Sequence, residues 1–339
     1  MRVSVWNLVP KAYEPHMLHA ESRAWVEKNC YVDIWIELLH AHRLDPMAML
    51  AFTVRHDFLD DQWVFFKPPH SDIEELYGID VQELNVWRPL VMHAIEQLAH
   101  GNLILTEADA HFLPDTRGTD YRQNHVKTTI VLETIDTDAH TLGYFHNGSY
   151  HELGGDDFDG ALGVTAAQRP AFLPLFAEVA RMKHVKRSTP NELGDRSLTL
   201  LRRHLARRPT DNPFVRFKNR FIGDVAALAS EGLAAYHVYA FATLRQCGAN
   251  FELTSLYLKW LDHLLGQRGE PRGDELERAS NCFDDISQTA KALILKGARA
   301  VTTKKAPDFS SMLGSMEAKW AEAMSLVDTA VGATNGLRA

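Results

Sequence analysis

Cysteine is scarce in this sequence. Cys30, Cys247 and Cys282 are the only three among 339 residues. They are widely spaced, and no Cys-x-x-Cys pair suggests a zinc site or a redox dithiol, so each is expected to be a free thiol. Histidines number 17, but none belongs to a His-Glu-x-x-His motif. We therefore expect no bound metal, and we expect Cys247 and Cys282, which lie within helical patterns, to be structural.

Long apolar runs and an excess of positive charge are also missing. No stretch approaches the roughly 20 consecutive apolar residues that a membrane span requires. The first residues, Met1 to Trp6, lack the apolar segment of a signal peptide. The formal net charge of -8 argues against general nucleic-acid binding, which needs a basic surface. We therefore expect a cytoplasmic protein that binds neither membranes nor nucleic acid.

The composition is that of an ordinary globular protein, with 45% hydrophobic and 24% charged residues. A chain of 339 residues exceeds one ordinary core, so two domains are expected. Helix and strand patterns alternate up to about residue 160, and from residue 165 onward the pattern is almost entirely helical. The predicted class is α+β, with a mixed domain at residues 1–160 and an all-α domain at residues 161–339.

The clearest element of the first half is a helix from Tyr31 to Ala41. Apolar residues recur along it at helical spacing, and Asn29 can cap its start, which places Cys30 in the first turn. Further helices are predicted at 71–76 and 89–100. Strands are predicted at 52–54, 63–66, 103–106, 126–134 and 141–145, the last two forming a hairpin.

The second half is predicted to consist of long helices. Asn212 and Pro213 have the residue types of a cap and a first helical position, and they open a helix expected to run to about Gly248. Further helices are predicted at 251–265, 274–300 and 309–331. These long apolar helices suggest a homodimer.

The start of a helix favours a thiolate, because its unpaired N–H groups and its dipole stabilise an anion. A nucleophilic Cys30 also needs an imidazole and a third polar group that orients it. His125 stands at the entry to the strand at 126–130, and Asn147 follows the return strand of the hairpin. We therefore predict a catalytic set of Cys30, His125 and Asn147, with His146 and Asp156 as competitors for the third position.

A longer pattern connects these residues. The segment Asp109-Ala110-His111-Phe112-Leu113-Pro114, followed by Tyr121 and then His125 before an apolar strand, resembles the acyltransferase family typified by the butirosin-biosynthesis acyltransferase. The similarity covers roughly residues 20 to 160, and a mainly helical C-terminal part is also similar. The family has Asp where this sequence has Asn147. The sequence also resembles an uncharacterised bacterial branch associated with amino-acid:carrier-protein ligases.

The resemblance implies a papain-like fold in the first half. It further implies transfer of an acyl group, often an aminoacyl group, from the phosphopantetheine thioester of a carrier protein to an amine through an acyl-Cys30 intermediate. No cofactor would be bound, because the partner carries the phosphopantetheine. The implied partners are an acyl or aminoacyl carrier protein and a small amine acceptor. Asn29, Trp35, Asp109 and Tyr121 are expected to contact the substrate or to support the catalytic residues.

Lys and Arg are concentrated between Arg181 and Arg220, in contrast to the acidic chain as a whole. Such a run is commonly a solvated helical face. Carrier proteins are acidic, however, so basic residues here could steer one toward the thiol. The predicted docking residues are Arg202, Arg203, Arg207 and Arg208.

Other interpretations of the same residues stay open. The site could hydrolyse its substrate as a thioesterase or peptidase, or the chain could bind an acylated carrier or a small molecule without catalysis. Cys30 could be a small core residue. His125 could bond a backbone carbonyl, and Asn147 precedes Gly148 in a turn-forming context that needs no function.

Overall fold

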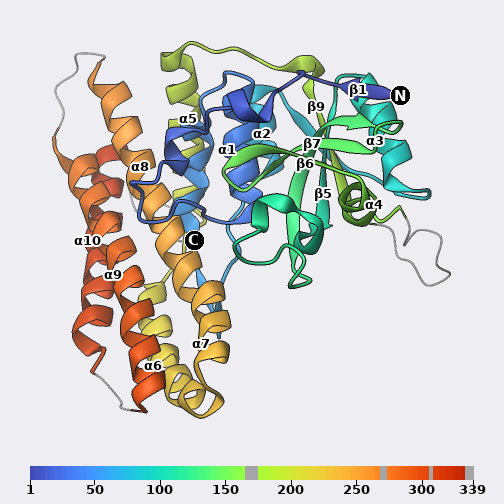
Figure 1. The fold of residues 1–339 in the computed structure, drawn as a ribbon. Coiled ribbons are helices and arrows are strands. Elements are labelled where there is room, and N and C mark those ends of the chain that lie inside the picture. Colours follow the sequence, from blue (N-terminus) through green and yellow to red (C-terminus); the bar gives the residue numbers. More distant parts are fainter. Residues whose placement is uncertain (165–174, 268–272, 305–307, 333–339) are drawn as a thin grey trace. The chain divides into compact units, whose positions relative to one another are not determined.

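The computed structural model describes residues 1–164, 175–267, 273–304 and 308–332, and its contacts divide the chain into two compact units (Figure 1). The first unit comprises residues 1–21, 29–46 and 69–187. The second comprises residues 22–28, 47–68 and 188–339. The predicted α+β class is confirmed, since the sheet lies in the first unit and the second is mainly helical.

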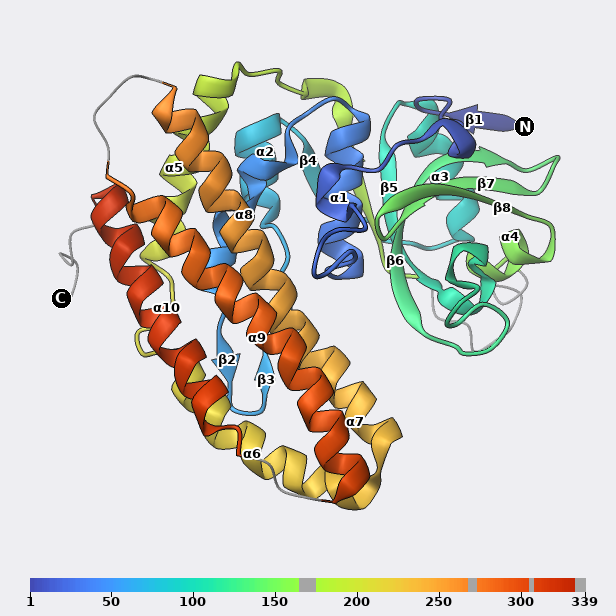
Figure 2. The same ribbon diagram turned by 60° about the vertical axis from the view of Figure 1, so that its left-hand side comes forward.

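The first unit is built on an antiparallel sheet (Figure 2). Its central hairpin was predicted. Strand β6 is long because every residue from Thr128 to Ile135 except Glu133 is β-branched or apolar. β1 pairs with β6 at the far end, opposite Thr134, Ile135 and Asp136. β1 is Arg2–Ser4. The order of the other strands across the sheet is β4 (Asp80–Glu83), β9 (Ala177–Arg181), β5 (Leu103–Asp109), β6 (Lys127–Asp136), β7 (Thr141–His146) and β8 (Ser149–Gly154).

Strand β9 corrects the predicted domain boundary. It lies between β4 and β5, and Ala177, Val179 and Ala180 are buried there. β9 has little β propensity of its own, because it is only five residues long and two of them are alanine. It forms a strand because it pairs with β4 on one side and β5 on the other. The first unit therefore continues to residue 187 rather than ending at 160. Residues 165–174 of the predicted boundary region lie outside the described residues.

Helix α1 (Cys30–Ala41) packs against β6, β7 and β8. Helix α3 (Leu90–Ala99) packs against β1, β5 and β6, and both views place it on the other side of the sheet from α1 (Figures 1 and 2). The three helices predicted in this region are confirmed. The other helical elements in the described part of this unit are η1 (Pro10–Ala12), η2 (Met17–His19), α2 (His70–Tyr77), η4 (Ala110–Phe112), η5 (Pro114–Thr116), α4 (Asp156–Ala161) and η7 (Met182–His184).

The second unit is a bundle in which α6, α8, α9 and α10 pack on one another. A short hairpin, β2–β3, contacts α6, and aromatic side chains of the hairpin and helices form much of the shared core. No helix in the described ranges combines the length and the apolar character of a membrane span. The elements are η3 (Pro46–Arg55), β2 (Phe58–Leu59), β3 (Gln62–Trp63), α5 (Pro190–Leu205), α6 (Pro213–Glu231), α7 (Leu233–Ala240), the π-helical η8 (Phe241–Arg245), α8 (Gln246–Gly266), α9 (Glu275–Thr303) and α10 (Ser310–Val331).

Three predictions in this unit were wrong in whole or in part. Residues 52–54 lie in the 3₁₀ helix η3, where Thr53 bonds back to the Leu50 carbonyl, because a short buried apolar run does not distinguish helix from strand. The strand at 63–66 is limited to Trp63 and its neighbour Gln62. The helix from Pro213 ends before Gly232, whose φ of 100° no L residue adopts readily.

Candidate functional site

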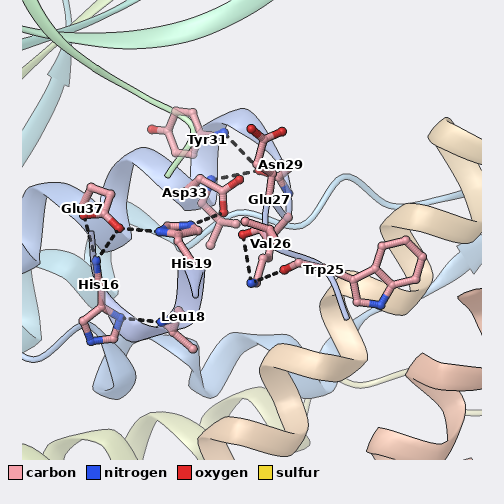
Figure 3. Close-up of polar contacts among 12 residues, drawn as sticks. His16, Leu18, His19, Trp25, Val26, Glu27, Asn29, Tyr31, Asp33 and Glu37 are labelled. Atoms are coloured by element: carbon pink, nitrogen blue, oxygen red, sulfur yellow. Dashed lines mark hydrogen bonds and ion pairs between the residues drawn. The ribbon is translucent and has the colours of Figure 1, made fainter. Parts of the chain in front are cut away.

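Cys30 is the first residue of α1, as predicted. The Asn29 side-chain oxygen accepts hydrogen bonds from the N–H groups of Tyr31 at 3.1 Å and Val32 at 2.9 Å, which starts the helix at the cysteine (Figure 3). The Cys30 thiol is partly exposed, and its Sγ lies 3.6 Å from Oγ1 of Thr129 on β6. The thiol therefore lies at the helix end that carries partial positive charge.

His125 lies just before β6 and is paired with Asp109 rather than with Cys30. Its Nδ1 is 2.6 Å from Oδ2 of Asp109, and its ring stacks on His111 with 4.3 Å between ring centroids. The side chain is 70% exposed. His125 precedes Thr129, the neighbour of the thiol, by four residues, which span about 13 Å in an extended chain. The structure therefore does not bring thiol and imidazole within hydrogen-bond distance.

The two groups nevertheless belong to the same side of the sheet. Thr129 pairs with Glu107 on β5, and Lys127 pairs with Asp109. Side chains alternate between faces along a strand, so Glu107 and Asp109 share the face of Thr129. A row of polar groups thus runs from Cys30 along this face to the imidazole.

Asn147 occupies the turn between β7 and β8 with a left-handed φ of 47°. The carboxylate that orients His125 belongs to Asp109, and the structure does not join Asn147, or its competitors His146 and Asp156, to that imidazole. The next residue, Gly148, lies against His19, where an added Cβ would come within 2.7 Å of Cγ. The Asn-Gly turn is thereby explained by packing.

The other predicted supporting residues have structural contacts. Asp109 Oδ1 accepts the His111 N–H at 3.0 Å, so Asp109 caps the irregular segment, as expected of an Asp in that position. The Tyr121 hydroxyl donates to Asp157 at 2.9 Å. Trp35 is completely buried in α1, which places it in the core and not at an open substrate site.

The predicted docking arginines lie at the end of α5 in the second unit. Arg208 makes two bonds of 2.6 Å to the Asp328 carboxylate, and Arg202 donates to the Val331 carbonyl at 3.1 Å. Both hold α10 in place, and the Arg208 charge is neutralised. Arg203 and Arg207 are exposed at the surface of this unit.

Two family segments match the chain, and they agree with the two units only in part, because residues 22–28 and 47–68 of the second unit lie within the first segment. Residues 14–182 match the DUF1839 N-terminal domain, and residues 190–329 match the DUF1839 C-terminal domain. The chain belongs to the DUF1839 family. The DUF1839 segments meet between 182 and 190, near the structural boundary after residue 187 and beyond the predicted one at 160. No curated protein sequence matches this DUF1839 chain significantly.

The DUF1839 N-terminal unit also contains a buried ionic cluster that the sequence did not reveal (Figure 3). The two ring nitrogens of His19 contact Asp33, at 2.9 Å, and Glu37, and the Tyr13 hydroxyl donates to Glu37 at 2.5 Å. Burial alone would lower the pKa of His19, but the two carboxylates raise it to about 9. The spacing of four residues between Asp33 and Glu37 on a helix predicts that the two carboxylates lie close together on one face. The sequence does not predict that His19 lies between them.

A second cluster surrounds Tyr31, the residue after Cys30. The Tyr31 hydroxyl lies 2.7 Å from Oε2 of Glu178 and 2.7 Å from Nε2 of His70. Burial and the negative charge of Glu178 raise the pKa of the Tyr31 phenol above its ordinary value. Glu178 lies on β9, so the sequence pattern that missed this strand also missed the cluster.

The other two thiols are buried and do not form a second candidate nucleophilic site. Cys247 and Cys282 are buried in α8 and α9, and burial raises the pKa of Cys247 and raises that of Cys282 to about 11. Neither favours a thiolate. Within the part of the chain that the structure describes, no group of three or more His, Cys, Asp or Glu side chains could hold a metal ion.

Proposed function

We propose that this protein transfers acyl groups through a thioester on Cys30, with a carrier-protein thioester as the donor and an amine as the acceptor. The observation that carries the proposal is the partly exposed thiol at the first position of a capped helix that packs on an antiparallel sheet. That arrangement also supports a papain-like interpretation of the first unit.

The first step is thiol–thioester exchange. The Cys30 sulfur attacks as a thiolate, a new S–C bond forms to the carbonyl carbon, the carrier's S–C bond breaks, and the carrier leaves as a thiolate. A thiolate leaving group needs no proton from the enzyme, whereas the amine released by a peptidase does. Because Cys30 contacts Thr129 and the His125 imidazole is paired with Asp109, the geometry favours exchange with a thioester over peptide hydrolysis.

The second step requires a neutral amine. We assign the Asp109–His125 pair to this step, because Asp109 orients the ring through Nδ1 and the exposed imidazole can reach an incoming ammonium group. The imidazole takes the proton from the ammonium before the amine attacks the acyl-Cys30 carbonyl. The new N–C bond then replaces the S–C bond, the attacking nitrogen loses its second proton to water, and the Cys30 thiolate is restored.

Intact-mass spectrometry after mixing with aminoacylated carrier proteins tests the first step. We expect wild type to gain the acyl mass, Cys30→Ala to gain none, and the control Cys282→Ala, which removes a buried thiol, to behave as wild type. Addition of amines should discharge the adduct. If carrier thioesters survive unchanged with wild type, acyl transfer is wrong, and tight binding of the same carrier would instead favour a non-catalytic binding protein.

His125→Ala separates the two steps. We expect this variant to form acyl-Cys30 at close to the wild-type rate but to release it to amines about 100-fold more slowly, a typical contribution of general base catalysis. Single-turnover mass measurements with and without amine give both rates. Equal loss of both steps would place His125 at the thiol during catalysis and contradict the separated roles.

A further inference from the structure

Three hydrogen-bonded side chains lie on the sheet face opposite the thiol. Thr128 Oγ1 is 2.8 Å from His146 Nε2, and His146 Nδ1 is 2.5 Å from Asp115 Oδ2. Thr128 and Thr129 are adjacent on β6, so their hydroxyls point to opposite faces, and only Thr129 contacts Cys30. The group is therefore separate from the site described above.

The contacts determine which atoms of this group donate hydrogen bonds and which accept them. Burial alone would raise the pKa of Asp115, but its hydrogen bond and attraction to His146 hold the pKa below its ordinary value. An ionised Asp115 only accepts hydrogen bonds, so His146 donates from Nδ1. In a neutral ring Nε2 is then the acceptor, and the Thr128 hydroxyl donates to it. A hydroxyl, an imidazole and an orienting carboxylate in this order are the arrangement that activates a nucleophile.

The hydroxyl lies just past the end of the β6–β7 ladder, at a residue that still pairs with Ala108 on β5. Pairing of β6 with β7 begins at Ile130, opposite His146, so Thr128 lies beyond the last pair of that ladder. Thr128 is 7% exposed, and the side chain of His151, which approaches Asp115 to 4.0 Å, is 29% exposed. Only a small acyl group could therefore reach Oγ1.

We propose that Thr128 is a second nucleophile, activated by His146 and Asp115, that accepts short acyl groups from activated esters independently of Cys30. Thr128 Oγ1 attacks the carbonyl carbon while His146 Nε2 takes the hydroxyl proton. The ester's C–O bond then breaks, and the leaving alcohol receives that proton. The products are O-acyl-Thr128 and the alcohol, and water later hydrolyses the new ester by the same route.

The experiment uses p-nitrophenyl acetate and the full-length Cys30→Ala protein, with peptide mapping to locate acetyl groups. We expect acetylation of Thr128, its loss in Thr128→Val, and its retention in the control Thr129→Val, which alters the adjacent hydroxyl on the other face. Thr128→Ser should be acetylated at least as fast, because it keeps the hydroxyl and removes a methyl group.

The role of the imidazole is tested by rate. His146→Gln, checked for folding by its thermal transition, should acetylate Thr128 about 100-fold more slowly. Absence of an acetyl group at position 128 both in folded Cys30→Ala and in the folded Cys30→Ala protein that also carries Thr128→Ser overturns the proposal. So does an unchanged rate in folded His146→Gln, which would mean that the group only braces the loop carrying Asp115.

Discussion

Replacement of His19 by glutamine is expected to lower the free energy of unfolding of the first unit by about 3–5 kcal/mol, the usual cost of breaking a buried ion pair. The His19 side chain is 1% exposed and lies between the fully buried carboxylates of Asp33 and Glu37. Glutamine cannot supply the positive charge, so two carboxylates would remain buried close together without a cation between them.

The same cluster makes the first unit sensitive to alkali. The pKa of His19 is raised to about 9 in the folded chain, against an ordinary 6.5. Between these values the folded state binds one more proton than the unfolded state. The stabilisation is therefore complete below pH 6.5 and is lost as the pH rises toward 9, at about 1.4 kcal/mol per pH unit.

Hydrogen exchange of the α1 amides between pH 6.5 and 9 measures this effect within the first unit, once the exchange rates are corrected for pH. Wild type should lose protection along the series, and His19→Gln should start lower and change little. His140→Gln is the matched control, because His140 pairs with Asp159 at 3.4 Å but is 53% exposed. A wild-type curve that is flat over this range would show that His19 is not held as a cation.

Replacement of His56 by phenylalanine is expected to make the second unit resistant to mild acid. Among the described residues neither ring nitrogen of His56 has a hydrogen-bond partner, and the ring stacks on Trp63 with 4.9 Å between centroids. Burial lowers the pKa of His56 to about 3. Below pH 6.5 the unfolded chain gains a proton that the folded chain cannot accept, so stability falls as the pH falls, by about 1.4 kcal/mol per unit.

Urea unfolding at pH 6.5 and pH 5.0, monitored by hydrogen exchange of the α8 amides, tests this prediction. Wild type should lose about 2 kcal/mol more than His56→Phe between the two pH values. Phenylalanine keeps the stacking on Trp63. Its larger volume could offset part of the stability gained at neutral pH by removing the buried imidazole. The control is His237→Phe at an exposed position of α7, which should keep the wild-type pH dependence. Equal slopes in wild type and His56→Phe would exclude His56 as the cause.

Local sequence signals predicted much of the scaffold around the thiol. Asn29 placed the start of α1 at Cys30, and the run of β-branched residues after His125 predicted the hairpin that α1 packs on. These signals depend on capping and on periodicity within about a dozen residues, which the chain displays without reference to its tertiary contacts. The same holds for Pro213 and the helix that it opens.

The partners of the candidate residues were not predictable in this way. Asp109, and not Asn147, orients His125, and Thr129 occupies the position next to the thiol where an imidazole was expected. Both facts depend on the register between strands, and a shift of one residue would exchange the faces on which these side chains lie.

The sequence by itself determined the α+β class, the two-part organisation, the helix that begins at Cys30 and the hairpin after His125, because each follows from local propensity and patterning. Only the tertiary structure decided that β9 joins the sheet, that His19 lies between two carboxylates, and that Thr128 and His146 meet. The His19 and Thr128 contacts join residues 14 to 18 positions apart, and β9 pairs with strands much further away along the chain. Their energy comes from burial and from strand pairing, which the folded chain creates and which no short segment contains.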